Sequence, residues 1–522
     1  MRRLRLVIAL LLVPALVLSA APAWVVAAGT SPAGTPGTAS ESDAEFIESP
    51  CWWDLPRNLE EGEDIVCGVV TVPLFHDDPD GETAQLAVGV INPDVEDPVS
   101  DPVFMLNGGP GGDSAVLVEF FAPSSFGSYA PILEDRTVVV FDQRGTGYSS
   151  PGLFCPGDIE PGEDEPLPGA EDIADDDIAG YAQACVDQFE DEDIDLEAFT
   201  TTESAYDILS ISQALGFDSV SLWGQSYGTR LALEAMRVLP EDAISSVVLE
   251  SVVAPDQPFL ATATIGFSDS LRLAFELCAD DADCDDAFPD LEQTYADVLA
   301  TLEDEPYESS FEDLTTGEET DVAVDPNTFN SILYQMLFSG ILVGQVPALI
   351  ALTDAGVYEA LDTLLPLLST TSSATGTYFS VSCQDWLAFE SADAYEDEVA
   401  EADVIPGIEE YGSGLDPQGY LDICDVFDLE ASDEDIIAPV ESDIPALLVS
   451  GAFDPITPPS GAEQVAETLP NSYVVTDPVL GHTPIGFSED CLMAGTIDFL
   501  ADPAEEPDFS CVDEETIEFL VP

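Results

Sequence analysis

The serine at position 226 stands in a setting that could make it a nucleophile. It occupies the centre of Gly224–Gly228, which reads GQSYG, after an apolar run at 219–223 and before a helical pattern at 227–239. This arrangement is typical of a nucleophile elbow, a sharp strand-to-helix turn that exposes the serine hydroxyl. Glycines fit at both flanks because a Cβ would collide in so tight a turn. An ordinary glycine turn is the alternative, but the flanking patterns favour a nucleophilic Ser226.

A serine hydroxyl needs a base, and the chain contains two histidines. His76 lies N-terminal to the elbow in a predicted hairpin turn, where a role as a surface turn residue would account for it. His482 follows a strand-like run at 472–476 and precedes a helical pattern. Hydrolases with the chain order Ser, acid, His carry their base in such a place. We therefore predict His482 as the base; a capping histidine in a loop is the alternative.

The third member of such a triad holds the imidazole in one tautomer and stabilises its charge. Among 105 acidic residues only position discriminates. Asp454 lies just beyond the apolar run at 445–449, and catalytic acids of α/β sheets follow the carboxyl ends of strands. We predict that Asp454 orients His482. The alternative is an Asp that forms a turn before Pro455.

An acyl-transfer site also needs two backbone N–H groups for the oxyanion. Tyr227, directly after the serine, is predicted to supply one of them. The other is expected from the glycine loop at 107–112, most plausibly from Gly109, because Pro110 has no N–H. A plain turn is the alternative. A phosphate-binding loop is excluded because the chain has no lysine to complete it.

The elements that must position these residues form an α/β pattern. Short apolar runs alternate with helical stretches, which is typical of a parallel sheet with crossover helices, and the segment 66–91 adds a hairpin. Between about 256 and 443 the patterns are mainly helical, which predicts a cap that controls substrate access. The predicted regions are 1–28 (export signal), 29–45 (flexible linker), 46–255 (N-terminal part of the core), 256–443 (helical cap) and 444–522 (C-terminal part of the core).

Five motif blocks occur in an order that resembles the proline iminopeptidase and tripeptidyl aminopeptidase group of α/β-hydrolases. The sequence SYGT at 226–229, which begins with the elbow serine, and the C-terminal region resemble the secreted bacterial tripeptidyl aminopeptidase branch. The resemblance implies an α/β-hydrolase fold with a helical cap, and removal of a residue or short peptide from a free N-terminus. The blocks are 108–112 (GGPGG), 142–149 (DQRGTGYS), 224–228 (GQSYG), 451–454 (GAFD) and 481–482 (GH).

A free N-terminus would need carboxylates to pair with its ammonium. Glu250, just past the run at 244–249, and Asp385 are the candidates by position. In so acidic a chain a solvated carboxylate is the strong alternative for each. The pair Leu249-Glu250 also departs from the Leu-Asp that the family would suggest. Arg144 is expected to pair with Asp142 rather than to touch substrate.

The charge of the chain excludes several function classes. Nine arginines and no lysine face 105 acids, giving a formal charge of −96. Nucleic-acid binding and attraction to an anionic membrane both need clustered cations and are excluded. The 46% of hydrophobic residues is still enough for a large core, so the acids must lie mainly at the surface. Such acidity fits a protein that works in concentrated salt.

Residues 1–28 have the basic start, apolar run and small-residue ends of an export signal, so we predict an extracytoplasmic protein. An uncleaved anchor helix is the alternative. The ten cysteines then indicate disulfides rather than a metal site. Proximity along the chain suggests the pairs Cys51–Cys67, Cys155–Cys185, Cys278–Cys284, Cys383–Cys424 and Cys491–Cys511.

Asp281, Asp283, Asp285 and Glu292 have the spacing of a calcium loop. The required glycine is replaced by Asp286, so we expect no calcium there, and neither a metal nor a cofactor is required by the predicted chemistry. We therefore predict a serine exopeptidase acting on peptides. Two alternatives remain: an esterase or amidase acting on small molecules with the same triad, and a non-catalytic binding protein on a hydrolase scaffold. Oligomeric state and the number of residues released stay open.

Overall fold

The computed structural model describes residues 44–53, 55–93, 95, 98–99, 101–122, 129–163, 166–170, 173, 177–315, 317, 319–369, 373–408, 417–488 and 491–522. The predicted export signal at 1–28 and most of the predicted linker at 29–45 lie outside the described residues. No helix in the part of the chain that is described is long and apolar enough to cross a membrane.

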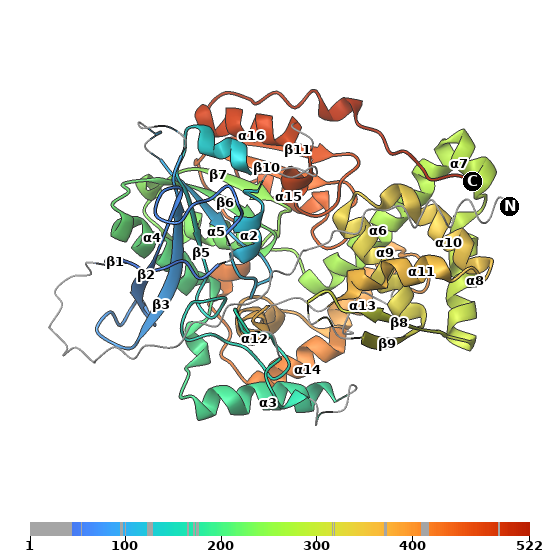
Figure 1. Ribbon diagram of the computed structural model, residues 1–522, viewed down its shortest axis with the longest axis horizontal. Coiled ribbons are helices and arrows are strands. Elements are labelled where there is room, and N and C mark those ends of the chain that lie inside the picture. Colours follow the sequence, from blue (N-terminus) through green and yellow to red (C-terminus); the bar gives the residue numbers. More distant parts are fainter. Residues whose placement is uncertain are drawn as a thin grey trace.

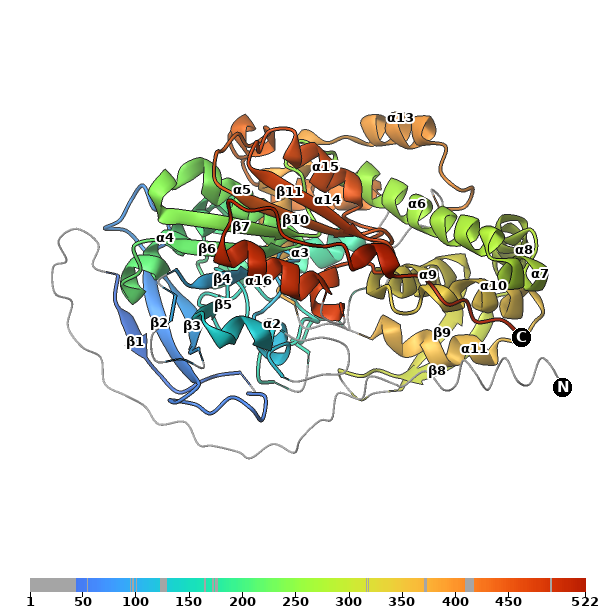
Figure 2. The same cartoon turned by 90° about the horizontal axis from the view of Figure 1, so that it is seen from above.

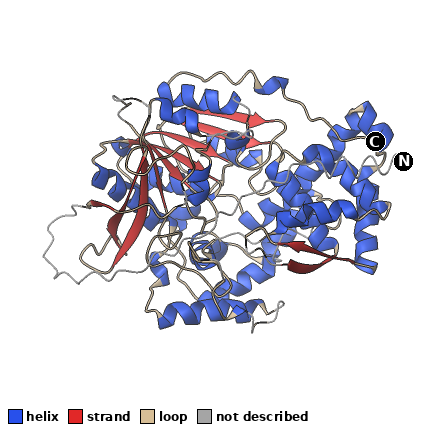
Figure 3. Ribbon diagram, in the orientation of Figure 1, coloured by secondary structure: helices blue, strands red, loops and turns tan. Residues whose placement is uncertain are grey.

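A twisted sheet forms the centre of the core (Figures 1 and 3). Among the described residues it has nine strands in the order β1-β2-β3-β5-β4-β6-β7-β10-β11. The pairs from β1 to β5 are antiparallel, and those from β5 through β4 to β11 are parallel. The strands are β1 Phe46–Glu48, β2 Ile65–Pro73, β3 Thr83–Ile91, β4 Val103–Leu106, β5 Val138–Phe141, β6 Val220–Gln225, β7 Ile244–Glu250, β10 Ala446–Gly451 and β11 Ser472–Asp477.

The parallel strands are continuous apolar runs because helices cover both faces of the sheet. In β4, Phe104 and Leu106 face one hydrophobic cluster, whereas Val103 and Met105 face another. The first cluster is covered by α3, α4, α5, α12, α14 and α15, and the second by α2 and α16 (Figure 2). These helices are α2 Ala115–Glu119, α3 Ile178–Asp191, α4 Thr201–Leu215, α5 Tyr227–Val238, α12 Thr375–Asp385, α14 Pro417–Phe427, α15 Pro459–Ala466 and α16 Cys491–Ala501.

The long segment between β7 and β10 is mainly helical, as the sequence predicts, and has two parts. Residues 259–368 build a body beside the sheet with its own hydrophobic cluster (Figure 1). Helices α12 and α14 instead pack on the core, whereas Ile405 and Ile408 join the cluster of the body. The body contains α6 Phe259–Asp280, α7 Ala282–Ala287, α8 Leu291–Asp304, α9 Pro326–Ser339, α10 Val346–Asp354 and α11 Glu359–Leu364; α13 Ala392–Ala402 follows α12.

Two details of this body differ from the sequence pattern. It contains a hairpin, β8 Tyr307–Glu312 and β9 Glu319–Val324, that the mainly helical sequence pattern does not indicate. Residues 346–368 also form three short helices, namely α10, α11 and a 3₁₀ helix, instead of one long helix. The first break falls at Gly356, whose φ of +69° ends a helix readily because glycine has no Cβ.

The C-terminal segment after α16 returns to this helical body (Figure 1). Ile517, Phe519 and Leu520 pack against its hydrophobic cluster, and the Leu520 N–H donates to Gly344 O at 2.9 Å. The C-terminal residues therefore link the core to the body.

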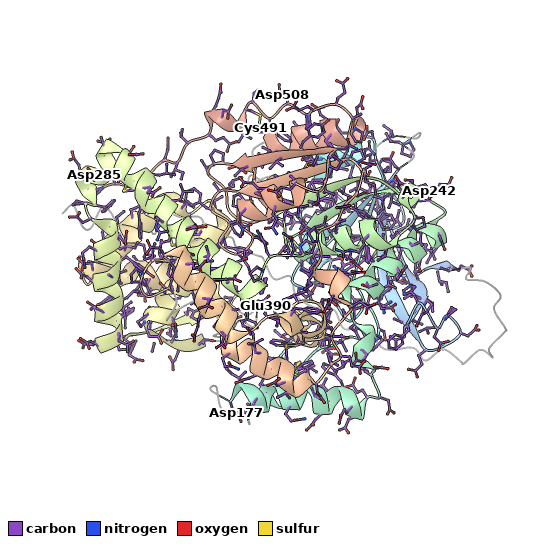
Figure 4. All side chains as sticks on the ribbon, turned by 180° about the vertical axis from the view of Figure 1, so that it is seen from behind. Asp177, Asp242, Asp285, Glu390, Cys491 and Asp508 are labelled. Carbon is purple, nitrogen blue, oxygen red and sulfur yellow. A yellow bond between two sulfur atoms is a disulfide. The ribbon has the colours of Figure 1, made fainter. Side chains whose placement is uncertain are left out.

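The five disulfides predicted from proximity are confirmed, and the described residues contain no free cysteine. The acids lie largely outside the core, as the labelled Asp177, Asp242, Asp285 and Asp508 illustrate at the periphery of Figure 4. The disulfides are Cys51–Cys67, Cys155–Cys185, Cys278–Cys284, Cys383–Cys424 and Cys491–Cys511.

Candidate active site

Ser226 lies in a strained turn between β6 and α5. Its φ of +55° and ψ of −125° are unusual for a residue with a side chain. Both flanking glycines are required: a Cβ on Gly228 would collide with Leu106 O, and one on Gly224 with Gly228 O. Ser226 is partly exposed although both neighbours in the turn are buried. The turn thus has the geometry of a nucleophile elbow.

His482 and Asp454 follow the ends of β11 and β10. His482 Nδ1 lies 2.8 Å from Asp454 Oδ2, and both side chains are buried. Burial alone would raise the pKa of Asp454, but the facing His482 and hydrogen bonds from His482 and Thr457 bring it below its ordinary value. Asp454 is therefore suited to stay ionised and to fix the proton of His482 on Nδ1.

Thr457 is a site residue that the sequence did not reveal. Its hydroxyl donates to Asp454 Oδ2 at 2.7 Å and lies 3.1 Å from His482 Nδ1. The N–H groups of Thr457 and Ile456 donate to Asp454 Oδ1 at 2.9 and 3.1 Å. An Asp followed by a tight turn is a signal for these backbone contacts. Nothing in the spacing indicates the hydroxyl contact.

The end of β7 connects the serine turn with the histidine loop. Glu250 O accepts the Ser226 N–H at 2.9 Å, and Glu250 Oε1 accepts the Ile485 N–H at 2.8 Å. Next along the chain, Ser251 Oγ accepts the Thr483 N–H at 2.8 Å. Because β6, β7, β10 and β11 are parallel neighbours, Ser226, Asp454 and His482 lie at one edge of the sheet.

The glycine loop after β4 lies directly against Ser226. A Cβ on Gly108 would come within 2.7 Å of Ser226 Cβ, so only glycine fits there. The Gly108 N–H is already bound by Asn107 Oδ1 at 2.8 Å. By contrast, the N–H groups of Gly109 and Tyr227 donate to no other group among the described residues. This is what a pair of oxyanion donors requires, although that role stays a prediction.

The two predicted amine-binding acids are fully buried. Glu250 Oε2 accepts from Trp223 Nε1 and Gln225 Nε2, both at 2.8 Å, besides the Ile485 contact. Asp385 accepts from Thr201 N–H at 2.8 Å and from the Ser432 hydroxyl at 2.6 Å.

Burial raises the pKa of both Glu250 and Asp385, against the opposing effect of these donors. The structure thus places both acids in internal hydrogen-bond networks, and their contact with a substrate amine stays a prediction.

The expected pairing of Arg144 with Asp142 is wrong. Arg144 binds Asp207 through two hydrogen bonds of 2.8 and 2.7 Å. Asp142 instead accepts the N–H groups of Ser114 and Tyr148 at 2.7 and 2.8 Å. The two side chains leave the turn after β5 in different directions. Asp142 binds backbone N–H groups of its own loop and of the segment before α2, whereas Arg144 binds Asp207 on α4.

His76 is not a simple surface turn residue. Its Nδ1 lies 2.6 Å from Glu203 Oε2, and its Nε2 lies 3.5 Å from Asp207 Oδ1. It therefore belongs to the network around Arg144, with no contact to Asp454 or His482. The calcium-like spacing is divided between two helices: Asp281 caps α7, and Glu292 lies in α8. The described residues hold no group of three potential metal ligands.

Comparison with known proteins gives two family matches. Residues 101–276 match a family described as "alpha/beta hydrolase fold", and residues 417–511 match one described as "TAP-like protein". The chain is 32% identical to tripeptidyl aminopeptidase of Streptomyces coelicolor over 42% of its own length. This alignment spans 40% of that relative, less than half of its length.

Two further proteins are similar over more of the chain. The serine protease Hip1 of Mycobacterium tuberculosis is 26% identical over 85% of this chain and 86% of the relative. A solved structure of proline iminopeptidase from Mycobacterium smegmatis covers 84% of this chain and 98% of its own, with 16% identity and a TM-score of 0.36. The two family matches, together with the tripeptidyl aminopeptidase and Hip1 relatives, confirm the resemblance inferred from the five motif blocks, and the chain has the α/β-hydrolase fold.

Proposed function

We propose that the protein is a secreted serine peptidase that cleaves peptide bonds near a free N-terminus. The observation that carries this proposal is the buried His482–Asp454 pair, 2.8 Å apart, at the sheet edge where Ser226 occupies a strained elbow. A buried Asp–His pair beside a strained serine turn is the arrangement that acyl transfer through a serine nucleophile uses.

The proposed reaction has two stages. His482 Nε2 takes the proton of Ser226 Oγ as Oγ bonds to the carbonyl carbon, and the N–H groups of Gly109 and Tyr227 stabilise the oxyanion. When the C–N bond breaks, His482 returns the proton to the leaving amine and an acyl-serine remains. Water then attacks this ester with His482 as base, releasing the peptide acid and restoring Ser226. No cofactor takes part in these steps.

Support for a peptide substrate comes from the relatives, which are named tripeptidyl aminopeptidase and serine protease. Recognition of a free amine is the finer part of the proposal. Glu250 and Asp385 are candidates by position, yet their oxygens already accept protein donors. This favours a role in holding the site together for both residues.

Export and adaptation to salt complete the proposal. Five disulfides are typical of a protein from an oxidising compartment, which supports a cleaved signal at 1–28. A formal charge of −96 supports work in concentrated salt, where self-repulsion is screened. We also propose the functional division into core parts 46–255 and 444–522 with a cap at 256–443.

The test uses the purified protein without its first 28 residues. A fluorophosphonate probe should label it, and Ser226→Ala should abolish labelling. Reporter amides of one to three residues with a free N-terminus should be hydrolysed, and their N-acetylated counterparts should react much more slowly. Absence of labelling in a folded protein would refute the serine-hydrolase proposal and support a non-catalytic binding protein.

An esterase or amidase of small molecules is the second candidate. One relative, 31% identical over 24% of this chain, is named carboxylesterase B. Equal hydrolysis of free and acetylated peptides, with faster turnover of simple esters, would favour this candidate over the peptidase.

A further inference from the structure

The end of α9, in the helical body, touches the predicted base directly. The carbonyl oxygen of Phe338 accepts the His482 N–H at 2.7 Å. The Phe338 ring also stacks on the imidazole, with ring centroids 4.4 Å apart and planes at 30°. One residue from a different hydrophobic cluster therefore holds both the backbone and the ring of His482. Figure 2 shows α9 reaching toward the ends of β10 and β11.

The contact is too close for side chains to intervene. A Cβ on Gly481 would collide with the carbonyl oxygens of Leu337 and Phe338, and a Cβ on Gly340 would collide with Gly481 N. Gly340 itself has a φ of +71°, which suits glycine at the end of a helix. The last turn of α9 and the histidine loop thus pack backbone against backbone.

This packing also satisfies groups that would otherwise be unpaired. The last carbonyls of a helix have no partner within the helix. Here Leu337 O accepts the Gly340 N–H at 3.0 Å, while Phe338 O is bound by His482. Moving the body away from the core would therefore leave both the Phe338 carbonyl and the His482 N–H without their hydrogen-bond partner. It would also remove the Phe338 ring from one face of the imidazole.

The stack adds to the restraints on the His482 ring. Asp454 and Thr457 hold Nδ1, so rotation about the Cβ–Cγ bond, which would turn Nε2 away from Ser226, has to break both contacts. Phe338 blocks that rotation on one face, and Tyr334 stacks behind it at 6.0 Å. An aromatic face also favours the imidazolium that forms when the base takes a proton.

We propose that Phe338 is a positioning residue, through which the docked helical body completes the active site by orienting His482. This inference rests on the proposed function. The C-terminal segment supports the same docking, because Leu520 binds Gly344 just beyond the end of α9. If the body were displaced, His482 Nε2 would no longer be held toward Ser226, and proton transfer from Ser226 Oγ would slow.

The test compares Phe338→Leu, Phe338→Ala and Phe338→Tyr with Phe329→Leu. Phe329 lies on the same helix, is fully buried in the cluster of the body and makes no stack with His482. Its substitution therefore controls for loss of an aromatic ring from α9. Rates are measured with a small activated ester, which needs Ser226 and His482 but no peptide recognition, and with fluorophosphonate labelling.

The expected result is a fall in kcat of about 10- to 100-fold for Phe338→Leu and more for Phe338→Ala, with KM nearly unchanged. Phe338→Tyr should restore most of the rate because it keeps the stack. Phe329→Leu should lower Tm but leave kcat close to that of the parent. Labelling of Phe338→Leu at the parental rate would overturn the inference, whereas an unlabelled parent would overturn the proposed function itself.

Discussion

Nδ1 of His482 lies 2.8 Å from Oδ2 of Asp454, and the carboxylate is fully buried beneath the imidazole. The turn that follows Asp454 holds its carboxylate, because Ile456 and Thr457 supply two N–H donors and one hydroxyl. The acid is therefore preorganised before substrate binds. A preorganised anion is what a histidine base needs when it becomes charged.

The first prediction concerns Asp454→Asn. The neutral amide keeps the size of the side chain but offers the imidazole a donor where it needs an acceptor, so the wrong tautomer is favoured. We expect kcat to fall by about 10⁴-fold with KM changed only a few-fold. Steady-state kinetics on a free-amine reporter peptide measure both values. A variant that retains a tenth of the parental kcat would show that Asp454 does not orient the base.

The second prediction concerns the hydroxyl of Thr457. Thr457→Val is nearly isosteric but removes the donor to Asp454 Oδ2, whereas Thr457→Ser retains it. A hydrogen bond to a charged group is worth about 1.5–3 kcal/mol, so kcat should fall by about 10- to 100-fold in the valine variant. The serine variant should stay close to the parent. A valine variant as active as the serine variant would show that the hydrogen bond from the hydroxyl to Asp454 does not support catalysis.

The third prediction separates two roles of Glu250. It accepts three N–H donors, and a glutamine would turn an NH₂ group toward at least one of them. We expect Glu250→Gln to lower the free energy of unfolding by about 1–3 kcal/mol. Rates on free-amine and acetylated substrates should fall by the same factor, and exposed Glu241→Gln serves as the control for charge. A rise in KM confined to free-amine substrates, without loss of stability, would instead identify an amine-binding residue.

The positions of the predicted triad follow from local sequence patterns, whereas its catalytic role stays a prediction. Ser226, Asp454 and His482 are each predicted to follow a strand, and they follow β6, β10 and β11. The disulfides follow from proximity in the same way. These patterns are local in the sequence. The parallel sheet brings the residues together, because the carboxyl ends of its strands lie at one edge.

Long-range partners are what the sequence could not supply. Phe338 reaches His482 from a helix of another cluster, and Arg144 pairs with Asp207 on α4 instead of the nearby Asp142. With 105 acids available, spacing cannot tell which carboxylate a given arginine meets. The sequence also does not indicate the hairpin β8–β9. Its strands contain many polar residues and are largely exposed, so they lack the apolar pattern by which a strand is recognised.

The fourth prediction uses the pH dependence of stability. Burial, together with the nearby Asp113, raises the pKa of Asp142 to about 7. The pKa of an aspartate in the unfolded chain is about 3.9. Between about pH 3.9 and about 7, therefore, Asp142 keeps its proton in the folded state and loses it on unfolding. Its contribution to stability is therefore largest at low pH and is lost as the pH rises toward 7.

Asp142→Asn removes this titration. Its free energy of unfolding relative to the parent should rise between pH 4.5 and 7.5, by an amount on the order of a few kcal/mol. Denaturant unfolding at four pH values measures the difference, with exposed Asp242→Asn as a control whose difference should stay flat. A difference for Asp142→Asn that does not change with pH would show that the carboxyl is ionised throughout.

The last prediction concerns salt. With 105 acids and nine arginines, the surface of the folded protein repels itself strongly at neutral pH. The Debye length falls from about 10 Å at 0.1 M to about 3 Å at 1 M salt, so NaCl screens this repulsion in the compact state more than in the expanded chain. We expect Tm at pH 7 to rise steeply between 0.1 and 2 M NaCl.

Sucrose, which acts by exclusion from the surface without screening, should stabilise far less at matched osmolality. At pH 4.5, where many carboxyls carry protons, the slope with NaCl should shrink. A Tm that ignores salt at pH 7, or a slope unchanged at pH 4.5, would mean that self-repulsion does not limit stability.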